Sequence, residues 1–430
     1  MSFRHPKERF TRRDFLVKGA AAAAGIPAAS ALLAACGSDQ QDVGTPVGSK
    51  LPISTKESPV SLPTFDDNNA IASGLDIEEG ATLKIYNWDQ YIWKKVVDDF
   101  GKKYDVKVEI STFNNMDEAL SKIRSAQVDF DVFFPTIDVL GKMTQFKLLQ
   151  PLNPDYLTNT SNLYDFYTES GGPFYDIGQV YTRPYTTYTT GIAWRNDLVS
   201  EKDDPDNRSN PYDLLWDSKY KGKIGIYDDY REATAMALLR NGGTDVNTGD
   251  AEELNAAKEA LIETVGDVNV ALTINGAYED LPKGIFSAHQ AWSGDIIAAP
   301  WYGKGSYTET APLLSYWWPK DRKAPVGNDL MAILKGAKNP VLAHTFINYM
   351  LDFEVAMKNM SWNGYQPPQN QAPPEAFLDP KFKWASNVPR NLVNCIVDYQ
   401  DMADGYWLTE LDPNVDAIWH DNWEQFTAGV

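Results

Sequence analysis

Cysteine is nearly absent from the 430-residue chain, which contains only Cys36 and Cys395. Cys36 stands near the N-terminus, directly after an Ala-rich apolar stretch, so the remainder of the chain has a single thiol. An intrachain disulfide in that remainder is excluded, and its stability has to come from buried apolar area.

Histidine is also scarce, and the sequence patterns of common catalytic sites are missing. The four histidines, His5, His289, His344 and His420, show no spacing typical of a metal site or a catalytic triad. Neither a Gly-x-Ser-x-Gly motif nor a phosphate-binding loop occurs. We therefore expect no enzyme, no metal site and no cofactor. A carboxylate-based glycoside hydrolase is the enzyme alternative that acidic residues flanked by Trp leave open.

Positive charge is in short supply as well. The chain has 39 Lys and Arg against 59 Asp and Glu, which gives a formal net charge of -20. This balance argues against nucleic acid as a partner, since such proteins need basic surfaces. It favours cationic ligands by long-range attraction, although it equally favours solubility.

The first 35 residues have the order of an export signal. Arg12-Arg13 stand before the apolar pair Phe15-Leu16, an Ala-rich stretch follows, and Leu33-Ala34-Ala35-Cys36 ends it. Adjacent arginines in this place are typical of the twin-arginine route, and small residues leading to a Cys resemble a lipobox. We expect residues 1–35 to be a signal peptide and Cys36 to carry a lipid anchor. The protein would then be held at a membrane in the periplasm or at the outer face of the cell membrane.

Residues 36–80 are rich in Pro, Ser, Gly and Asp and show almost no apolar periodicity. Such a composition predicts a flexible tether. The body that follows has roughly 350 residues, which exceeds one hydrophobic core and suggests two domains.

The body alternates between strand and helix patterns, which predicts an α/β fold with two open lobes. The expected strands are 83–88, 106–110, 130–134, 223–227 and 330–334. The expected helices include one with Trp93, Val96, Val97 and Phe100 on one face, one with Met116, Leu120 and Ile123, and those at 232–240 and 342–351.

Acidic and aromatic side chains follow these strands, at the edge where ligands bind in open α/β folds. The segments concerned are Trp88 to Tyr91, Pro135 to Asp138, Asp229 to Glu232 and Trp292 to Asp295, together with Asp329 and Tyr365. Each has an alternative structural explanation: core packing for Trp and Tyr, a capping box for Asp229 to Glu232, and a turn for Trp292 to Asp295.

Taken together, the acids and rings suit an organic cation. Carboxylates replace the water that an ammonium group loses, and a ring face adds roughly 0.5 to 2 kcal/mol for each well-placed cation. Aromatic walls with acidic ends predict a polyamine site.

The chain resembles the spermidine/putrescine-binding family of extracellular solute-binding proteins, the receptors of polyamine ABC importers. The resemblance extends from about residue 82 to 410. Its phrases are Tyr86-Asn87-Trp88, Asp131-Val132-Phe133-Phe134-Pro135, Leu215-Trp216-Asp217-Ser218-Lys219-Tyr220-Lys221-Gly222, Asp229 to Glu232, Trp292-Ser293-Gly294-Asp295 and Asn363-Gly364-Tyr365.

The resemblance implies a type II periplasmic-binding-protein fold, with two α/β lobes joined by a hinge and a ligand cleft between them. We expect residues 81–187 and 296–352 in the first lobe and residues 188–295 and 353–430 in the second. The partners that the resemblance implies are a small cationic ligand, a polyamine, and the permease subunits of an ABC importer, with the protein itself a monomer.

The resemblance also implies which residues bind the ligand. Trp88, Tyr91 and Tyr365 would supply rings, Thr136 a polar neighbour, and Asp229, Glu232, Trp292, Asp295 and Asp329 the remaining contacts. Three positions depart from the family: Asp89 stands where relatives often have Ser or Thr, Asp138 lies near an expected aromatic, and Gly327 replaces another. We include Asp89 and Asp138 in the expected site.

These departures leave the identity of the polyamine open, and a longer or more highly charged one would suit the extra acid. They also leave open a receptor for another small solute, such as an opine-like or amino-acid-like compound. A cationic side chain lining the cleft, with Arg231 as the candidate, would favour that alternative.

Overall fold

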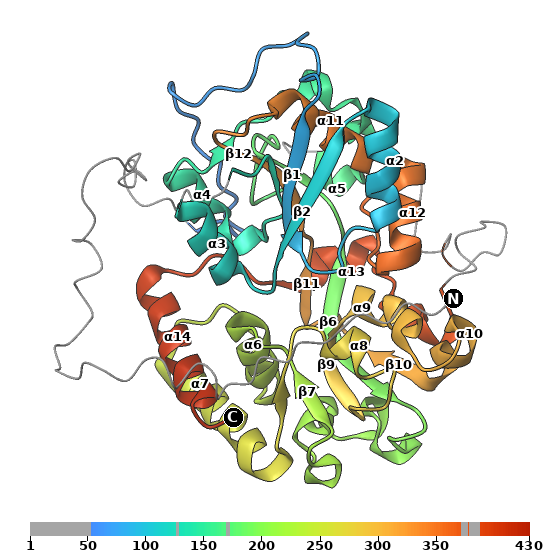
Figure 1. Cartoon of the computed structure of the whole chain (residues 1–430). Helices are drawn as coiled ribbons and strands as arrows, with labels where there is room; N and C mark the ends of the chain where they lie inside the picture. The colour runs from blue at the N-terminus through green and yellow to red at the C-terminus, as the bar shows by residue number, and fades with distance from the viewer. Residues whose placement is uncertain (1–52, 126–128, 169–172, 371–376, 378–387) are drawn as a thin grey trace, which may run out of the picture. The chain divides into compact units, whose positions relative to one another are not determined.

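The structure is a computed structural model that describes residues 53–125, 129–168, 173–370, 377 and 388–430. These residues form two lobes, each built on a mixed β-sheet with helices against it (Figure 1). The α/β class with two lobes, predicted from the alternating pattern, is confirmed.

The sheet of the first lobe has six strands, and its first three run parallel. In spatial order they are β2 (Lys107–Phe113), β1 (Thr82–Trp88), β3 (Val132–Phe133), β12 (Leu330–Leu334) and β4 (Leu149–Gln150), with β5 (Thr182–Pro184) also paired to β12. The predicted late strand is β12, and it runs antiparallel to β3, β4 and β5. It therefore enters the sheet from the opposite end, which brings Asp329 to the edge where β1 and β3 finish.

Apolar spacing explains the first helices of this lobe. Helix α2 (Lys94–Tyr104) buries Val96, Val97 and Phe100, the predicted face. Helix α3 (Met116–Arg124) buries Met116 and Ala119, while Leu120 and Ile123 are only partly buried against the core. The other helices here are α4 (Leu140–Gln145), α5 (Asp165–Thr168) and α11 (Pro340–Met350).

The sheet of the second lobe has seven strands. In spatial order they are β13 (Tyr406–Trp407), β11 (Pro325–Gly327), β6 (Tyr188–Arg195), β9 (Ala288–Trp292), β7 (Ile224–Ile226) and β8 (Ala271–Leu272), with β10 (Leu314–Trp317) also paired to β6. Its helices are α6 (Tyr230–Arg240), α7 (Ala251–Glu263), α8 (Gly276–Glu279), α9 (Ser293–Ala298), α10 (Tyr307–Thr310) and α14 (Pro413–Thr427). Trp292 to Asp295, which could have been a turn, instead ends β9 and begins α9.

The boundary between the lobes differs from the expectation. Strands β10 and β11 pair with β6, so residues 314–327 belong to the second lobe and not to the first. The chain returns to the first lobe only between β11 and β12. Helix α12 (Phe353–Asn363) lies at the border, where it contacts both α2 and α9, and α13 (Tyr399–Asp404) contacts β11. Residues 314–327 therefore do not lie in the first lobe, where they were expected, and the other predicted boundaries stay predictions.

Three chain segments meet at the border of the lobes. The backbone N–H of Tyr185 donates to the carbonyl of Asp329 at 2.8 Å, and that of Thr187 donates to the carbonyl of Gln366 at 2.8 Å. These bonds connect three segments of the chain: the one between β5 and β6, the one between β11 and β12, and the one after α12. They form a common hinge and fix Asp329 at its centre.

Residues 53–80 are packed on the body, so the predicted tether is wrong for this part of it. Leu62 is buried in the core of the first lobe, and the Asn68 amide donates to the carbonyl of Leu149 at 2.8 Å. The Glu78 carboxylate accepts hydrogen bonds from the backbone N–H groups of Val341 and Leu342 at 3.0 and 2.9 Å. Glu78 thereby caps the N-terminus of α11 from outside the helix.

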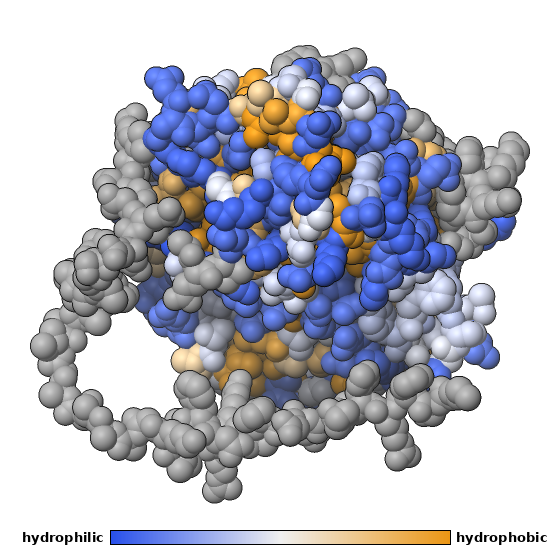
Figure 2. Space-filling view, turned by 45° about the horizontal axis from the view of Figure 1, so that its top comes forward, coloured by the Kyte–Doolittle hydropathy of each residue, from blue (hydrophilic) through white to orange (hydrophobic). Residues whose placement is uncertain are grey.

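The expected signal peptide, residues 1–35, and the anchor at Cys36 lie outside the described residues, as do residues 37–52. No helix in the described part of the chain has the length and apolar character needed to cross a bilayer. The face shown in Figure 2 is mostly hydrophilic, with smaller apolar patches between.

Replacing Glu78 by Ala should lower the free energy of unfolding by about 1–2 kcal/mol, the usual effect of losing a helix cap. Denaturant unfolding of Glu78→Ala, with Glu79→Ala as the matched control, measures this. Glu79 is exposed and caps no helix, so its removal should change the stability by less than about 0.5 kcal/mol. Equal effects of the two changes would contradict the capping role.

Candidate functional site

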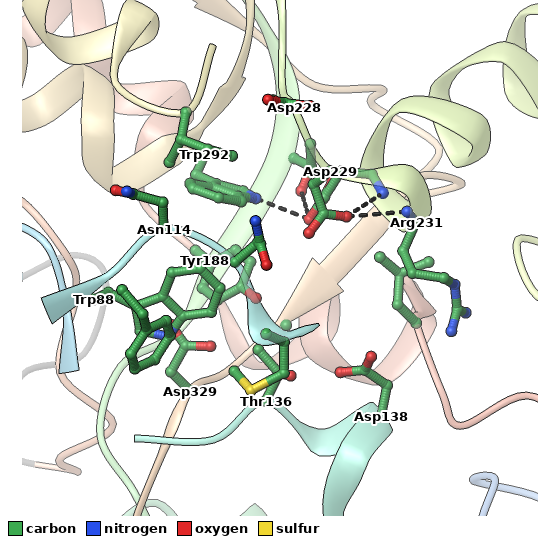
Figure 3. Close-up of a pocket in the computed structure, with 18 of the residues that line it drawn as sticks. Trp88, Asn114, Thr136, Asp138, Tyr188, Asp228, Asp229, Arg231, Trp292 and Asp329 are labelled. Carbon is green, nitrogen blue, oxygen red and sulfur yellow. Dashed lines mark hydrogen bonds between the residues drawn. The ribbon is translucent and has the colours of Figure 1, made fainter. Parts of the chain in front are cut away.

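A cavity of about 320 Å³ lies between the two lobes and collects the predicted residues. Its size falls in the range of small-molecule sites, roughly 300–1,000 Å³. All eleven expected site residues line it: Trp88, Asp89, Tyr91, Thr136, Asp138, Asp229, Glu232, Trp292, Asp295, Asp329 and Tyr365. Figure 3 shows acids and rings from both lobes facing one space.

Trp88, Tyr188 and Trp292 are three of the half-buried rings that line the cavity. Trp88 comes from the end of β1 and Trp292 from the end of β9, and their ring centroids lie 6.4 Å apart in an edge-to-face arrangement. Tyr188, at the start of β6, lies 6.3 Å from the Trp292 ring. Rings from both lobes thus meet across the cleft, as they would in a closed binding site.

Trp292 is held rigidly. Its ring stacks on Tyr227 at 3.9 Å, its backbone N–H donates to the Tyr227 hydroxyl at 2.7 Å, and its indole Nε1 donates to Glu232 Oε1 at 2.8 Å. An aromatic wall fixed in this way loses little conformational entropy when a ligand binds.

Glu232 lies on α6 and is 5% exposed. Its Oε1 accepts from Trp292 and from the Thr190 hydroxyl, whereas Oε2 is buried and has no hydrogen-bond partner. Burial raises the pKa of Glu232 to about 8, and the negative charge of Asp229 adds to the increase. A buried acceptor without a donor is costly, and an incoming ammonium group would remove that cost.

Asp329 presents the same situation from the hinge. It is 7% exposed, its Oδ2 accepts from the Tyr91 hydroxyl at 2.6 Å, and its Oδ1 is buried without a hydrogen-bond partner. Burial raises the pKa of Asp329 to about 7, although the hydrogen bond from Tyr91 opposes this increase.

Tyr91 and Tyr365 line the cavity, but both are more than nine-tenths buried. The Tyr91 hydroxyl is bonded to Asp329, and the Tyr365 hydroxyl donates to Asp295 Oδ1 at 2.8 Å. The other Asp295 oxygen accepts from Tyr227 at 2.8 Å. These two tyrosines therefore orient carboxylates more than they form open walls, and Asp295 in turn holds Tyr365 and Tyr227.

Asp229 caps a helix, as its alternative structural explanation predicted. Its Oδ1 accepts from the backbone N–H groups of Arg231 and Glu232, so it is the N-cap of α6. It also lines the cavity. Burial raises the pKa of Asp229 to about 6, with a further contribution from the charge of Asp138. The structural and the functional interpretation of this residue therefore hold together.

Sequence reasoning missed Tyr188. Its partner in the ladder between β6 and β11 is Gly327, the position where an aromatic was expected. A Cβ atom at residue 327 would come within 2.8 Å of the Tyr188 ring. Tyr188 therefore occupies the space beside Gly327, and the ring missing from position 327 is supplied by another strand. Only the strand pairing could have revealed this.

Arg231, the cation that would favour another solute if it lined the cleft, is among the residues that line the cavity (Figure 3). Its guanidinium donates to the Thr409 carbonyl at 2.8 Å and to Asn247 Oδ1 at 2.6 Å, and it lies over the Trp419 ring. Lys142 also lines the cavity, but its Nζ lies 2.7 Å from Asp416 Oδ2 in an ion pair. Both cations have partners among the described residues, but Nε of Arg231 is buried without a hydrogen-bond partner.

The buried acids at the cavity have no such partners. Among the described residues, no Lys or Arg forms an ion pair with Glu232, Asp329 or Asp295. No group of three or more Asp, Glu, His or Cys in the same part of the chain is arranged to hold a metal ion. The arrangement therefore suits an organic cation with apolar segments between its charges.

Comparisons with known proteins agree with this chemistry. The model of a family described as bacterial extracellular solute-binding protein matches residues 95–389. The spermidine/putrescine-binding periplasmic protein of Salmonella typhimurium is 26% identical over 364 residues, which are 84% of this chain and 96% of that protein. The putrescine/cadaverine-binding protein of Pseudomonas aeruginosa is 26% identical over 302 residues, 70% of this chain and 82% of that protein.

The solved structures agree on the fold. A protein assigned to a spermidine/putrescine ABC transporter of Listeria monocytogenes is 25% identical, with a TM-score of 0.66, covering 80% of this chain and 98% of that one. The type II periplasmic-binding-protein fold that the resemblance implied is confirmed.

The buried acids predict that the unliganded protein loses stability as the pH rises. Glu232 has a folded pKa of about 8, above the unfolded value near 4.5, so the folded state binds the proton more tightly between these values. This contribution is fully present below about pH 4.5 and is lost as the pH rises through about 8. Thermal melts at pH 5.5 and pH 8 should show a smaller loss for Glu232→Gln than for the wild type.

The exposed Glu109 on β2 supplies the control for this measurement, because Glu109→Gln removes a charge without touching the cavity. It should melt like the wild type at both pH values. A Glu232→Gln protein with the full pH-dependent loss would show that Glu232 is ionised at no cost to folding.

Proposed function

Because the chain belongs to the family of bacterial extracellular solute-binding proteins, we propose that it captures a polyamine between its lobes and delivers it to the permease of an ABC importer. One observation carries this proposal. Glu232 in the second lobe and Asp329 at the hinge each have a buried carboxylate oxygen without a hydrogen-bond partner, Oε2 and Oδ1 respectively. The rings of Trp88, Tyr188 and Trp292 line the same cavity. Relatives named for spermidine and putrescine support the same ligand class.

Capture would follow from the geometry in a few steps. Two ammonium groups replace the missing donors at Glu232 and Asp329, which become fully ionised in the complex. The methylenes between the ammonium groups lie against the three rings, and Thr136 Oγ1, which is buried without a partner, adds a polar contact. The complex favours the closed lobes because the contacts come from both of them.

The location of the protein forms part of the proposal. We propose export by the twin-arginine route, removal of residues 1–35 and lipid attachment at Cys36. Export of a folded receptor to the outside of the cytoplasmic membrane and its retention there would keep it near its permease. The sequence of Arg12-Arg13 and Leu33 to Cys36 supports this location.

Isothermal titration of the purified protein with putrescine and spermidine tests the proposed ligand class. We expect binding of both ligand types to weaken by ten- to a hundredfold in Glu232→Gln and in Asp329→Asn, since each change removes a charge-assisted hydrogen bond worth about 1.5–3 kcal/mol. Glu109→Gln should bind like the wild type. Titration with amino acids and oligosaccharides completes the test, and tight binding of those in place of polyamines would contradict the proposal.

The affinity should also rise with pH. Glu232 and Asp329 have pKa values of about 8 and about 7 in the empty cleft, so each holds a proton at pH 6 that ligand binding must displace. Polyamine ammonium groups resemble Lys, with a pKa near 10.4, and stay charged throughout. Raising the pH from 6 to 8 should therefore tighten binding, by up to about tenfold per unit for each proton released.

Titrations in two buffers of different ionisation enthalpy count the released protons. Proton release at pH 6.5 that falls in Glu232→Gln is the expected result. An affinity that is independent of pH in the wild type would show that these carboxylates do not meet the ligand's charges.

A further inference from the structure

We propose that a latch between α4 of the first lobe and the chain around α14 of the second lobe holds the two lobes together and controls how fast the cleft opens. The latch consists of Lys142 with Asp416 and of Gly141 with Glu410. Its contacts join protein to protein, so they act in addition to any contact with a ligand. The inference goes beyond the proposed function, because it concerns how readily the lobes part and not which solute they hold.

The first contact of the latch is an ion pair that crosses the border of the lobes. Lys142 lies on α4, which belongs to the first lobe because Leu140 and Met143 are buried in the core there. Its Nζ lies 2.7 Å from Asp416 Oδ2 in the first turn of α14, a helix on the same side of the molecule as α4 (Figure 1). The side chain of Asp416 is only 13% exposed, so salt screens this pair less than a fully exposed one.

The second lobe holds Asp416 in place for this pairing. Its other oxygen, Oδ1, accepts a hydrogen bond from the Tyr230 hydroxyl at 2.8 Å, and Tyr230 begins α6. Helix α14 packs on α6 and α7, and its Trp419 and Phe426 are buried in the core of the second lobe. Asp416 therefore moves with the second lobe when the lobes part, whereas Lys142 moves with the first.

Glu410 supplies the second contact, shortly before α14. The carbonyl of Thr409 accepts from Arg231 on α6 and Leu411 is buried in the core of the second lobe, so Glu410 belongs to that lobe. Its carboxylate lies against the backbone of α4 at Gly141, where a Cβ atom would overlap Glu410 Oε2. Glycine at this position thus permits an approach of the two lobes that a side chain would block. Glu410 lines a separate cavity of about 20 Å³ and not the ligand cavity.

These contacts form when the lobes are together, whatever the cleft contains. Breaking them is part of the cost of opening, both for a ligand that enters and for one that leaves. An interaction that stabilises the empty and the occupied closed forms equally slows both steps and changes the affinity little. The acids and rings of the cleft differ from the latch in this respect, because they stabilise only the occupied form.

Small-angle X-ray scattering of the protein without polyamine tests whether the latch holds the lobes together. Lys142→Gln and Glu410→Gln should each have a larger radius of gyration than the wild type, because parted lobes are less compact. The measurement is made at pH 8, above the value of about 7 to which burial raises the pKa of Glu410. Lys147→Gln is the matched control, since Lys147 lies 2.7 Å from Asp67 in an ion pair within the first lobe. It should scatter like the wild type.

Exchanging the two charges separates the latch from a general effect on folding. Lys142→Asp sets two carboxylates against each other and should open the lobes further than Lys142→Gln does. Combining Lys142→Asp with Asp416→Lys restores an ion pair across the same border, so the radius of gyration should return toward that of the wild type. Wild-type radii in all single variants, or a combined variant as open as Lys142→Asp, would overturn the inference.

Stopped-flow measurement of spermidine binding provides the kinetic test. Lys142→Gln and Glu410→Gln should each raise both the association and the dissociation rate constant by about threefold to fivefold, roughly the effect of one partly exposed ion pair. The Kd should change by less than about twofold, because the latch acts on both closed forms. Faster dissociation with unchanged association would assign these residues to ligand contact and contradict the latch. Unchanged rates would contradict it as well.

The outcomes separate this inference from the proposed function. The scattering experiment uses no ligand, so a protein that binds no polyamine but opens in the latch variants loses the proposed function and keeps the latch. A protein that binds polyamines, with the same radius and the same rates in the variants as in the wild type, keeps the function and loses the latch.

Discussion

Everything at the cleft depends on the cost of burying a carboxylate without a cation. Glu232 and Asp329 each give one oxygen to protein donors and leave the other in a place that water cannot reach. A folded protein tolerates such groups by keeping them protonated, which is why burial raises their pKa values to about 8 and about 7. A cation that bound beside these oxygens would remove this unfavourable energy.

The surrounding residues hold these acids in place. Tyr91 fixes Asp329, Trp292 and Thr190 fix Glu232, and Tyr227 and Tyr365 fix Asp295. Each positioning group is itself buried or stacked, so the acids cannot turn away to form other contacts. A preorganised set of acceptors loses less entropy on binding than flexible side chains would. Ligand specificity would then depend on the spacing and the charge of these fixed acids.

The two lobes meet at the hinge where Asp329 lies, and this position has a mechanical consequence. The backbone of Asp329 accepts a hydrogen bond from Tyr185 in the neighbouring crossing segment, while its side chain faces the cavity. A ligand that bound this carboxylate would, on the proposed function, act directly on the segments that join the lobes. The match to the family of bacterial extracellular solute-binding proteins favours a receptor over a carboxylate-based hydrolase.

The sequence by itself determined the α/β class and several of the strands and helices of the two lobes. Regular apolar spacing predicted β1, α2 and β12. Strand ends share one edge of a sheet, and the eleven residues expected there or from the family resemblance are among those that line the cavity. The sequence segments that resemble the family implied the same fold.

Tertiary structure decided the rest. Strand pairing placed β10 and β11 in the second lobe and set Tyr188 beside Gly327, and neither follows from local sequence because pairing joins segments far apart in the chain. Residues 53–80 read as unstructured because their contacts, such as Glu78 with α11, are isolated and lack periodicity. Which oxygens remain unpartnered depends on hydrogen bonds between distant elements. The sequence could therefore name Glu232 and Asp329, but only the folded chain shows what each of them lacks.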